Sequence, residues 1–344
     1  MKKKIISNTI IFLVILLFVN GFKFIFGSNN SLVGVTIIIS ILVLMQEDLT
    51  KNLSSNLIKL LFMNLISGVF SNIATHNMYL GLILNFSILL LIGYSLTSKL
   101  NKVMVVPFGL QYLFMLYTPV TGSDFTKRLV GLATGALLIM LVQLIIYKGS
   151  KNNKVEDGKV ENTINNESNS FNEDKKENEY IKLFNKFNIH HVRGAYAIRI
   201  ALLTTIAVFL VDYFNLAQGR WIVYTIFSLT ELYSEHCRIR SKQRLQGTVI
   251  GIIIIMLLFT VIKDSAIRGL IVLLGGYLDT YTTNYRDKII CVTMSVVASV
   301  SLTNGTITTA IERVGYICVG IILALLADKL VFNKKLEYRG CRTK

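Results

Sequence analysis

Long apolar segments alternate with short polar segments along most of the chain. Twelve apolar segments can be delimited, and turns or charged residues separate them. They cover residues 5–26, 32–45, 57–74, 79–96, 103–117, 129–147, 195–214, 221–233, 245–262, 267–281, 289–302 and 314–332. Many of these segments approach the ~20 residues that an α-helix needs to cross a bilayer. The pattern therefore predicts an all-α polytopic membrane protein with about twelve transmembrane helices.

One polar segment is much longer than the others. Residues 148–180 are rich in Asn, Lys and Glu and contain almost no large apolar side chains, so they cannot bury enough surface to fold alone. Residues 180–191 carry apolar side chains at helical spacing, which predicts a short amphipathic helix that can lie on the membrane surface. The chain then divides into a six-helix membrane repeat at 1–147, a linker with this helix at 148–190, and a second six-helix repeat with a short tail at 191–344.

Composition agrees with a membrane protein, because 53% of the residues are hydrophobic and only 16% are charged, against about 25% charged in soluble domains. The net charge of +16 comes largely from Lys and Arg beside the predicted spans, where the positive-inside rule explains them without a nucleic-acid partner. If twelve spans alternate, the main basic groups all fall on one side of the bilayer. The sequence therefore predicts a multi-pass protein of the cell membrane whose termini and linker are cytoplasmic.

A repeated motif supports two copies of a six-helix unit. R-L-V-G-L-A-T-G at residues 128–135 resembles R-L-Q-G-T-V-I-G at residues 244–251, and Arg313 and Gly320 have the same seven-residue offset. The distance along the chain from Thr36 to Arg128 is close to that from Thr225 to Arg313. Because six is an even number, both copies enter the bilayer from the same side. This predicts two parallel repeats about an axis along the membrane normal, with any transport site near their interface.

The richest polar pattern lies in residues 219–262, which we interpret as two helices joined by a basic loop. The loop carries a group of cations at Arg238, Arg240, Lys242 and Arg244. Gly247 and Gly251 form a G-x-x-x-G pair, which lets a second helix approach closely in lipid, and Gly131 and Gly135 have the corresponding spacing in the first copy. Arg244 shares a helix face with both glycines and is placed at the helix N-terminus.

Five residues are candidates for substrate binding. Arg244 can attract an anion at the cytoplasmic entrance, or it can serve only as a positive-inside anchor. Arg220 and Trp221 can offer a cation and a ring to an aromatic acid, or they can be an ordinary interfacial pair. Arg128 and Arg313 fall at the outer ends of their spans, where they can bind a departing anion or pair with neighbouring carboxylates, Asp124 and Glu312.

Glu231 is the candidate for proton coupling, because an ionisable residue within a membrane span is a functional candidate by default. If the helix ends sooner than residue 233, Glu231 is instead a loop residue. No metal site is expected, since the histidines have no ligand spacing and the four cysteines form no C-x-x-C pair. The sequence contains no phosphate-binding loop and no catalytic triad, so we expect neither an enzyme nor a cofactor.

Residues 195–262 resemble the fusaric-acid-resistance-like (FUSC) domain of the aromatic acid exporters. The residues that carry the resemblance are Arg199, Trp221, Thr225, Arg244, Gly247, Thr248 and Gly251. In the first copy Gly68 is retained, but Leu61 stands seven positions earlier in place of an arginine. Family members are exporters of aromatic carboxylic acids and related anions, and the membrane part of plant aluminium-activated malate channels is similar. Many members carry a large cytoplasmic domain, which we do not expect in this chain.

The resemblance implies a cell-membrane transporter for efflux of aromatic carboxylic acids or other organic anions. Its partners are then the lipid bilayer and a small organic anion, and the sequence leaves open whether the chain forms a homo-oligomer. Two alternatives stay open. One is an anion channel of the same fold, which needs no coupling carboxylate at Glu231. The other is a non-transporting membrane scaffold or envelope factor.

Overall fold

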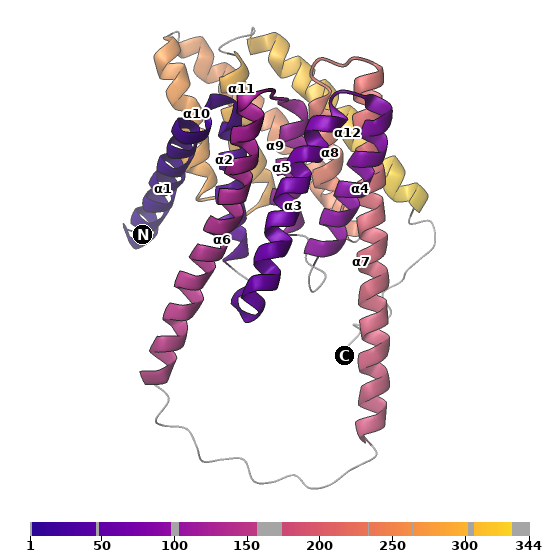
Figure 1. Ribbon diagram of the computed structural model, residues 1–344. Helices are drawn as coiled ribbons and strands as arrows, with labels where there is room; N and C mark the ends of the chain where they lie inside the picture. The colour runs from indigo at the N-terminus through magenta and orange to yellow at the C-terminus, as the bar shows by residue number, and fades with distance from the viewer. Residues whose placement is uncertain are drawn as a thin grey trace, which may run out of the picture. The chain divides into compact units, whose positions relative to one another are not determined.

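The computed structural model of the protein describes residues 2–45, 48–97, 103–156, 174–232, 234–262, 264–301 and 306–331. Within these residues the chain forms twelve α-helices and no strand. The helices are α1 (Lys2–Phe26), α2 (Ser31–Leu44), α3 (Leu53–Ala74), α4 (Met78–Leu96), α5 (Val105–Tyr117), α6 (Ser123–Glu156), α7 (Asp174–Tyr213), α8 (Arg220–Leu229), α9 (Ser234–Val261), α10 (Ser265–Asp279), α11 (Tyr285–Ser301) and α12 (Thr306–Val331) (Figure 1). Short 3₁₀ helices, Ser28–Asn30 and Thr50–Asn52, precede α2 and α3. The predicted all-α class is confirmed.

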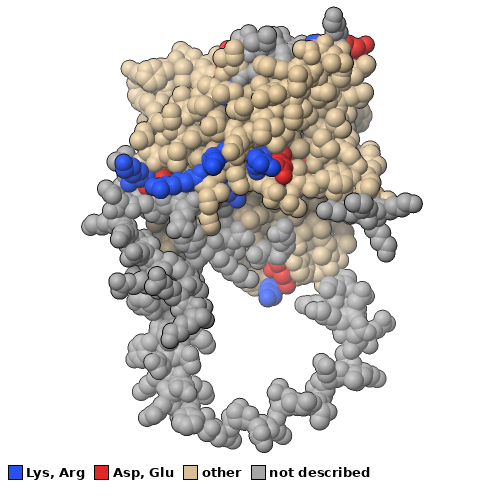
Figure 2. Space-filling view, turned by 180° about the vertical axis from the view of Figure 1, so that it is seen from behind, with Lys and Arg blue, Asp and Glu red and all other residues tan. Residues whose placement is uncertain are grey.

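Six of the described helices are long and apolar enough to cross a membrane, namely α1, α3, α4, α6, α7 and α9, and α2 and α5 are shorter apolar helices. Many large apolar side chains lie on the surface, among them Leu17, Phe24 and Val261, and Phe24 is 91% exposed. Among the described residues on the face seen in Figure 2, the charged side chains lie in a few small groups, and the rest of the described surface is uncharged. A soluble protein rarely exposes so much apolar surface, so the chain is a multi-pass membrane protein.

The helices form two compact units, which we name by their central helices. The α2–α6 unit is Val19–Ala201, and the α8–α12 unit consists of the described parts of Met1–Phe18 and Leu202–Lys344. In the α2–α6 unit, α3 packs on α4, α5 and α6, and α2 packs on α5 and α6. Gly135 of α6 meets the Ile37 side chain of α2. The small residue therefore allows close helix packing, as expected in lipid.

In the α8–α12 unit, α9 and α10 both pack along α11, and α12 crosses α8 and α9. A cluster of buried apolar side chains from α9, α10 and α11 holds this part together: Ile252, Ile255, Phe259, Ile271, Val297 and Ala298. The first part of α1 also belongs to this unit. Its Phe12 ring meets the Tyr277 ring edge-on at 5.4 Å between centroids, and Asn8 Nδ2 donates to the carbonyl oxygen of Thr280 at 3.0 Å.

The α7 helix begins in the other unit. The Arg193 guanidinium donates to the carbonyl oxygens of Tyr94 and Ser95 at the end of α4, and Gly93 packs on Ala197. The compact units thus differ from the predicted division at residues 1–147 and 191–344, because part of α1 packs with the second half and much of α7 with the first. The predicted arrangement of two parallel repeats stays a prediction.

Three boundaries differ from those expected from the sequence. The polar residues after 147 continue α6 to Glu156, and α7 begins at Asp174, so residues expected to form a disordered linker are helical at both ends (Figure 1). Residues 157–173 lie outside the described part. The amphipathic helix expected at 180–191 is not separate, because α7 runs without a break from Asp174 to Tyr213.

The largest correction concerns the expected basic loop. The α9 helix begins at Ser234, so Arg238, Arg240, Lys242 and Arg244 lie on its first three turns and not in a loop. Arg, Lys and Gln favour helices, and no glycine or proline interrupts residues 234–246. Arg244 consequently lies ten residues inside a helix instead of at its N-terminus.

Candidate functional site

The candidate site is built around α8, the shortest of the described α-helices. Its 10 residues span about 15 Å, half the thickness of a bilayer core. Side chains from Ile222 to Phe227 and Leu229 are buried. The helix ends where Thr230 adopts extended dihedral angles, and Gly219 before it packs on Val211. Because α8 is short and buried, both of its ends lie inside the packed unit, where they meet arginines from α9 and α12.

Arg313 of α12 lies at the beginning of α8. Only 4% of this residue is exposed, and its guanidinium carbon lies 4.0 Å from the centroid of the Trp221 ring. Within the part of the chain that the structure describes, Nε and Nη1 of Arg313 form no hydrogen bond and no carboxylate pairs with it. Glu312, the neighbour that the sequence offered as a partner, is exposed. A buried guanidinium is thus left with free N–H groups beside an aromatic ring.

Two other arginines add positive charge to this position. The Arg220 guanidinium lies 5.8 Å from the Trp221 centroid, and its Nη2 donates to Gln218 Oε1 at 3.0 Å. Its buried Nε has no partner in the described chain. Arg220 and Arg244 both lie close enough to Arg313 for their charges to repel its guanidinium. Like charges of this kind are unfavourable in a low-dielectric interior unless an anion offsets them.

Arg244 of α9 occupies the other end of α8 and is 8% exposed. Its Nη1 donates to Ser228 Oγ at 2.7 Å and to the Tyr285 hydroxyl at 3.0 Å, whereas its buried Nε is unpaired among the described residues. Ser228 and Tyr285 were not candidates from the sequence. The only available indication was that each is a polar residue within or beside an apolar segment. Arg244 therefore has two hydroxyl partners and keeps one N–H group for a further acceptor.

Glu231 lies in the short connection after α8 and not within a helix, as one of the two sequence interpretations anticipated. It is nevertheless buried. Its Oε1 lies 2.8 Å from Nη1 of Arg240, and the Arg240 guanidinium also lies over the Tyr285 ring at 4.9 Å from the centroid. The Glu231 carboxylate is thus held by an ion pair with Arg240.

Glycines bring the helices of the site together. A Cβ at Gly247 would meet the carbonyl oxygen of Arg286 at 2.7 Å, and one at Gly251 would meet Thr293 Cβ at 2.9 Å. Both glycines therefore seat α9 directly on α11. A Cβ at Gly320 would meet Thr225 Cβ at 2.8 Å, so this glycine seats α12 on α8. The close approach of α12 to α8 is what carries Arg313 to the Trp221 ring.

Arg128 is bound differently from the other candidate arginines. It is 2% exposed, and its Nε donates to Asn30 Oδ1 at 2.8 Å. Its Nη2 and Nη1 donate to the carbonyl oxygens of Asn29 at 3.1 Å and Met115 at 3.5 Å. The guanidinium thus fixes the α1–α2 connection to the end of α5. Its position near the C-terminal carbonyls of α5 suits a cation.

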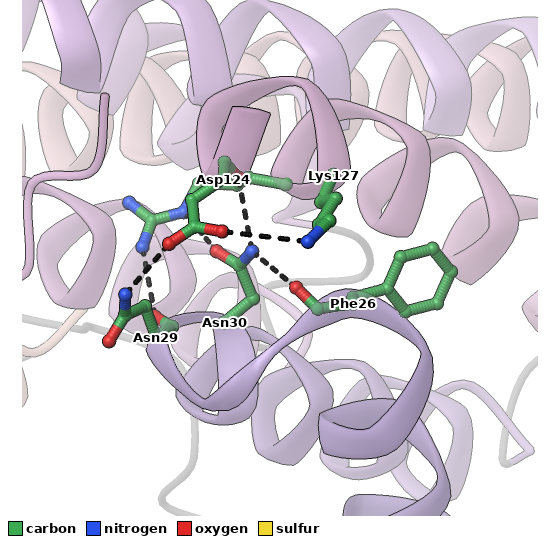
Figure 3. A network of polar contacts seen from close by, with 6 residues as sticks. Phe26, Asn29, Asn30, Asp124 and Lys127 are labelled. Carbon is green, nitrogen blue, oxygen red and sulfur yellow. Dashed lines mark hydrogen bonds and ion pairs between the residues drawn. The ribbon is translucent and has the colours of Figure 1, made fainter. Parts of the chain in front are cut away.

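Asp124 completes the same network without a direct contact to Arg128. Its carboxylate accepts a hydrogen bond from Asn29 Nδ2 at 2.8 Å and lies 3.8 Å from the Lys127 ammonium. Asn30 Nδ2 donates to the carbonyl oxygens of Phe26 and Asp124. Figure 3 shows Asn29, Asn30 and Lys127 gathered around Asp124. The alternative of a direct Arg128–Asp124 pair is therefore not the arrangement observed. Gly131, one turn further along α6, packs on Phe22.

Together these features define a polytopic helical membrane protein with buried, partly unpaired arginines in its α8–α12 unit. Residues 206–327 match the sequence model of the fusaric acid resistance protein-like family, FUSC_2. The match contains α8 to α11 and most of α12, which are the helices that carry Trp221, Arg244 and Arg313. The predicted resemblance is confirmed, and the matched family indicates a membrane transport protein. No curated protein and no solved structure matches the chain.

Proposed function

We propose that the protein is a cell-membrane transporter that exports aromatic carboxylates or other organic anions, and that the anion binds Arg313 beside Trp221. The observation that carries this proposal is the buried Arg313 guanidinium, whose Nε and Nη1 form no hydrogen bond with the described residues. Removing a cation from water costs several kcal/mol unless an opposite charge and hydrogen bonds compensate. Within the described residues, no carboxylate pairs with Arg313 and no hydrogen bond reaches its Nε or Nη1. A carboxylate or sulfonate can supply both, because its oxygens match the fork of a guanidinium.

The aromatic side chains around the Arg313 guanidinium support an aromatic substrate. Trp221 lies against Arg313 and meets Tyr224 edge-on at 5.6 Å between ring centroids. An aromatic acid can place its anionic group on the arginine and its ring among these aromatic side chains. Arg244, about 10 Å further along α8 by helix rise, would receive the anion at a second position towards the cytoplasmic end.

An anion channel is the second candidate, and the Glu231–Arg240 ion pair is the observation that favours it. The Glu231 carboxylate already has a partner in the chain, Arg240 at 2.8 Å, and a residue held in a structural ion pair need not carry protons for transport. A channel needs no proton-coupling group, so its flux would survive replacement of Glu231 by glutamine. A proton-coupled exporter would instead lose pH-gradient-driven accumulation in the same variant.

Trp221 offers a direct test of the proposed site, because it is the only tryptophan in the chain. In nanodiscs containing the purified protein, sodium benzoate should change the tryptophan emission saturably. Replacing Arg313 by glutamine should raise the benzoate Kd about tenfold or more, since a hydrogen bond to a charged group contributes about 1.5–3 kcal/mol and 1.4 kcal/mol corresponds to a factor of ten.

The matched control for this measurement is Arg238→Gln, which removes one exposed arginine from α9 and should leave the Kd unchanged. Transport is measured in proteoliposomes with labelled benzenesulfonate, an aromatic anion that does not cross the bilayer as a neutral acid. If emission does not respond to benzoate and benzenesulfonate does not move, the anion-transport proposal is wrong and a non-transporting membrane factor is the better interpretation.

We also propose that the termini lie in the cytoplasm, because the main basic groups between the helices fall on one side when the helices alternate. Lys51 and Thr75 flank α3, and both are exposed. In a variant without its native cysteines, a cysteine at position 75 should react in intact cells with an impermeant maleimide. A cysteine at position 51 should react only after the cells are opened. The reverse pattern would show that the orientation is inverted.

A further inference from the structure

Corresponding residues in the two halves of the chain have different hydrogen-bond partners. The shared seven-residue offset aligns Arg128 of α6 with Arg313 of α12, and Gly135 with Gly320. The structure adds a packing correspondence, because Gly135 packs on Ile37 of α2, the residue after Thr36, and Gly320 packs on Thr225 of α8. Each arginine therefore lies two helical turns before a glycine that crosses the matching short helix.

At the first of these positions the chain itself satisfies the arginine. Nε of Arg128 is occupied by Asn30 Oδ1, and its two terminal nitrogens donate to backbone carbonyls. Nε and Nη1 of Arg313 have no such partners in the described chain. The Asn30 amide oxygen thus stands where the proposed function places an oxygen of the anion in the α8–α12 unit.

The two corresponding threonines show the same contrast. The Thr36 hydroxyl shares its hydrogen between the Val33 carbonyl oxygen at 2.8 Å and Gln111 Oε1 at 3.2 Å. Gln111 Nε2 in turn donates to Asn64 Oδ1 at 3.0 Å. Asn64 Nδ2 continues this path to the Leu132 carbonyl oxygen. All of these side chains are buried, and none is charged. The Thr225 hydroxyl, by contrast, has no hydrogen-bond partner in the described chain although it is completely buried.

Two further residues of the candidate site, Arg244 and Trp221, have no counterpart in the first half of the chain. Leu61 occupies the position seven residues before Gly68, where Arg244 stands before Gly251, and Leu32 precedes Thr36 by the four residues that separate Trp221 from Thr225. The α2–α6 unit thus lacks the counterparts of both Arg244 and Trp221. The buried Thr36, Gln111 and Asn64 side chains of this unit form an uncharged path of internal hydrogen bonds, and such networks stabilise a fixed packing.

We propose that each chain binds a single anion, in the α8–α12 unit, and that the corresponding position of the α2–α6 unit is a closed structural core with Asn30 in the place of the anion. This inference rests on the proposed function, since it presumes that Arg313 binds an anion. It makes the two halves unequal in function: one recognises the substrate, and the other holds its helices together.

The experiment counts bound anions. Labelled benzoate is titrated against the full chain in nanodiscs, with empty nanodiscs as background, while Trp221 emission is followed in the same samples. We expect one benzoate per chain, with the emission change and the total binding saturating together. Arg313→Gln should weaken both about tenfold or more. Arg128→Lys should lower the melting temperature, because Asn30 and the carbonyl of Met115 lose donors, but leave the Kd of the folded protein unchanged.

Two benzoates per chain, with one retained by Arg313→Gln, would overturn the single-site inference and leave the proposed function standing. An Arg128→Lys protein that melts like the parent but binds benzoate more weakly would overturn it as well. The absence of any saturable binding would overturn the proposed function and this inference with it. The number of benzoates bound per chain of the parent protein tests the single-site inference even if Arg128→Lys fails to fold.

Discussion

Replacing Gly251 by leucine is expected to prevent the α8–α12 unit from assembling. A Cβ at this position would lie 2.9 Å from Thr293 Cβ and 3.0 Å from the carbonyl oxygen of Ile290, so α9 and α11 would have to move apart. Overpacking by a few methylene groups costs about 1–3 kcal/mol in well-packed cores. Here the obstacle includes helix backbone, which cannot turn aside as a flexible side chain can. We expect little or no folded protein, and correspondingly no benzenesulfonate transport.

The measurement is the yield of monodisperse protein extracted from membranes, together with its melting temperature. Gly315→Leu is the matched control, because a Cβ at Gly315 of α12 has no neighbour within 4 Å and leucine favours a helix by about 1 kcal/mol over glycine. This control should assemble at least as well as the parent. Normal yield and melting temperature of Gly251→Leu would show that the α9–α11 contact does not depend on the small residue.

The architecture was the most predictable feature, because helix formation in a bilayer depends on runs of apolar residues that can be counted. All twelve helices lie where the apolar segments predict them, but several of them begin or end at residues other than the predicted ones. The α9 helix begins eleven residues before the predicted start at Leu245, because charged residues were taken as the mark of a loop. Charged residues with high helix propensity can extend a spanning helix beyond the hydrocarbon core.

The candidate site was predictable only as far as it depends on one helix. The spacing of Arg244, Gly247 and Gly251 places them on one face of α9, and in the structure both glycines pack against α11. The partners of Arg244 come from other helices, Ser228 from α8 and Tyr285 from α11, and no periodicity along the chain indicates them. Arg128 and Arg313 look alike in sequence. Only the fold shows that Asn30 accepts a hydrogen bond from Arg128, whereas Nε and Nη1 of Arg313 have no hydrogen-bond partner among the described residues.

Arg244→Ala is expected to lower anion transport about tenfold or more while leaving the protein folded. Arg244 donates to two hydroxyl groups and keeps its Nε for a further acceptor. Replacing it by alanine therefore removes a positive charge and a directional hydrogen-bond donor, and it leaves the glycine contacts of α9 in place. Arg244→Lys should transport at an intermediate rate, because an ammonium keeps the charge but not the guanidinium fork. Tyr285→Phe, which removes one partner of the arginine and no charge, should have a smaller effect than either.

The variants are compared by initial rates of benzenesulfonate flux in proteoliposomes, normalised to the amount of inserted protein. Arg238→Ala is the control on the same helix, since Arg238 is exposed and a general loss of basic charge would affect both positions equally. Equal losses in Arg238→Ala and Arg244→Ala would reduce Arg244 to a contributor to overall charge. Transport by Arg244→Ala at the parent rate would make it a topological anchor only. Depletion of Arg244→Ala from the membrane would instead give the residue a structural role, through its hydrogen bonds to Ser228 and Tyr285, and would leave Arg313 as the single anion-binding arginine of the site.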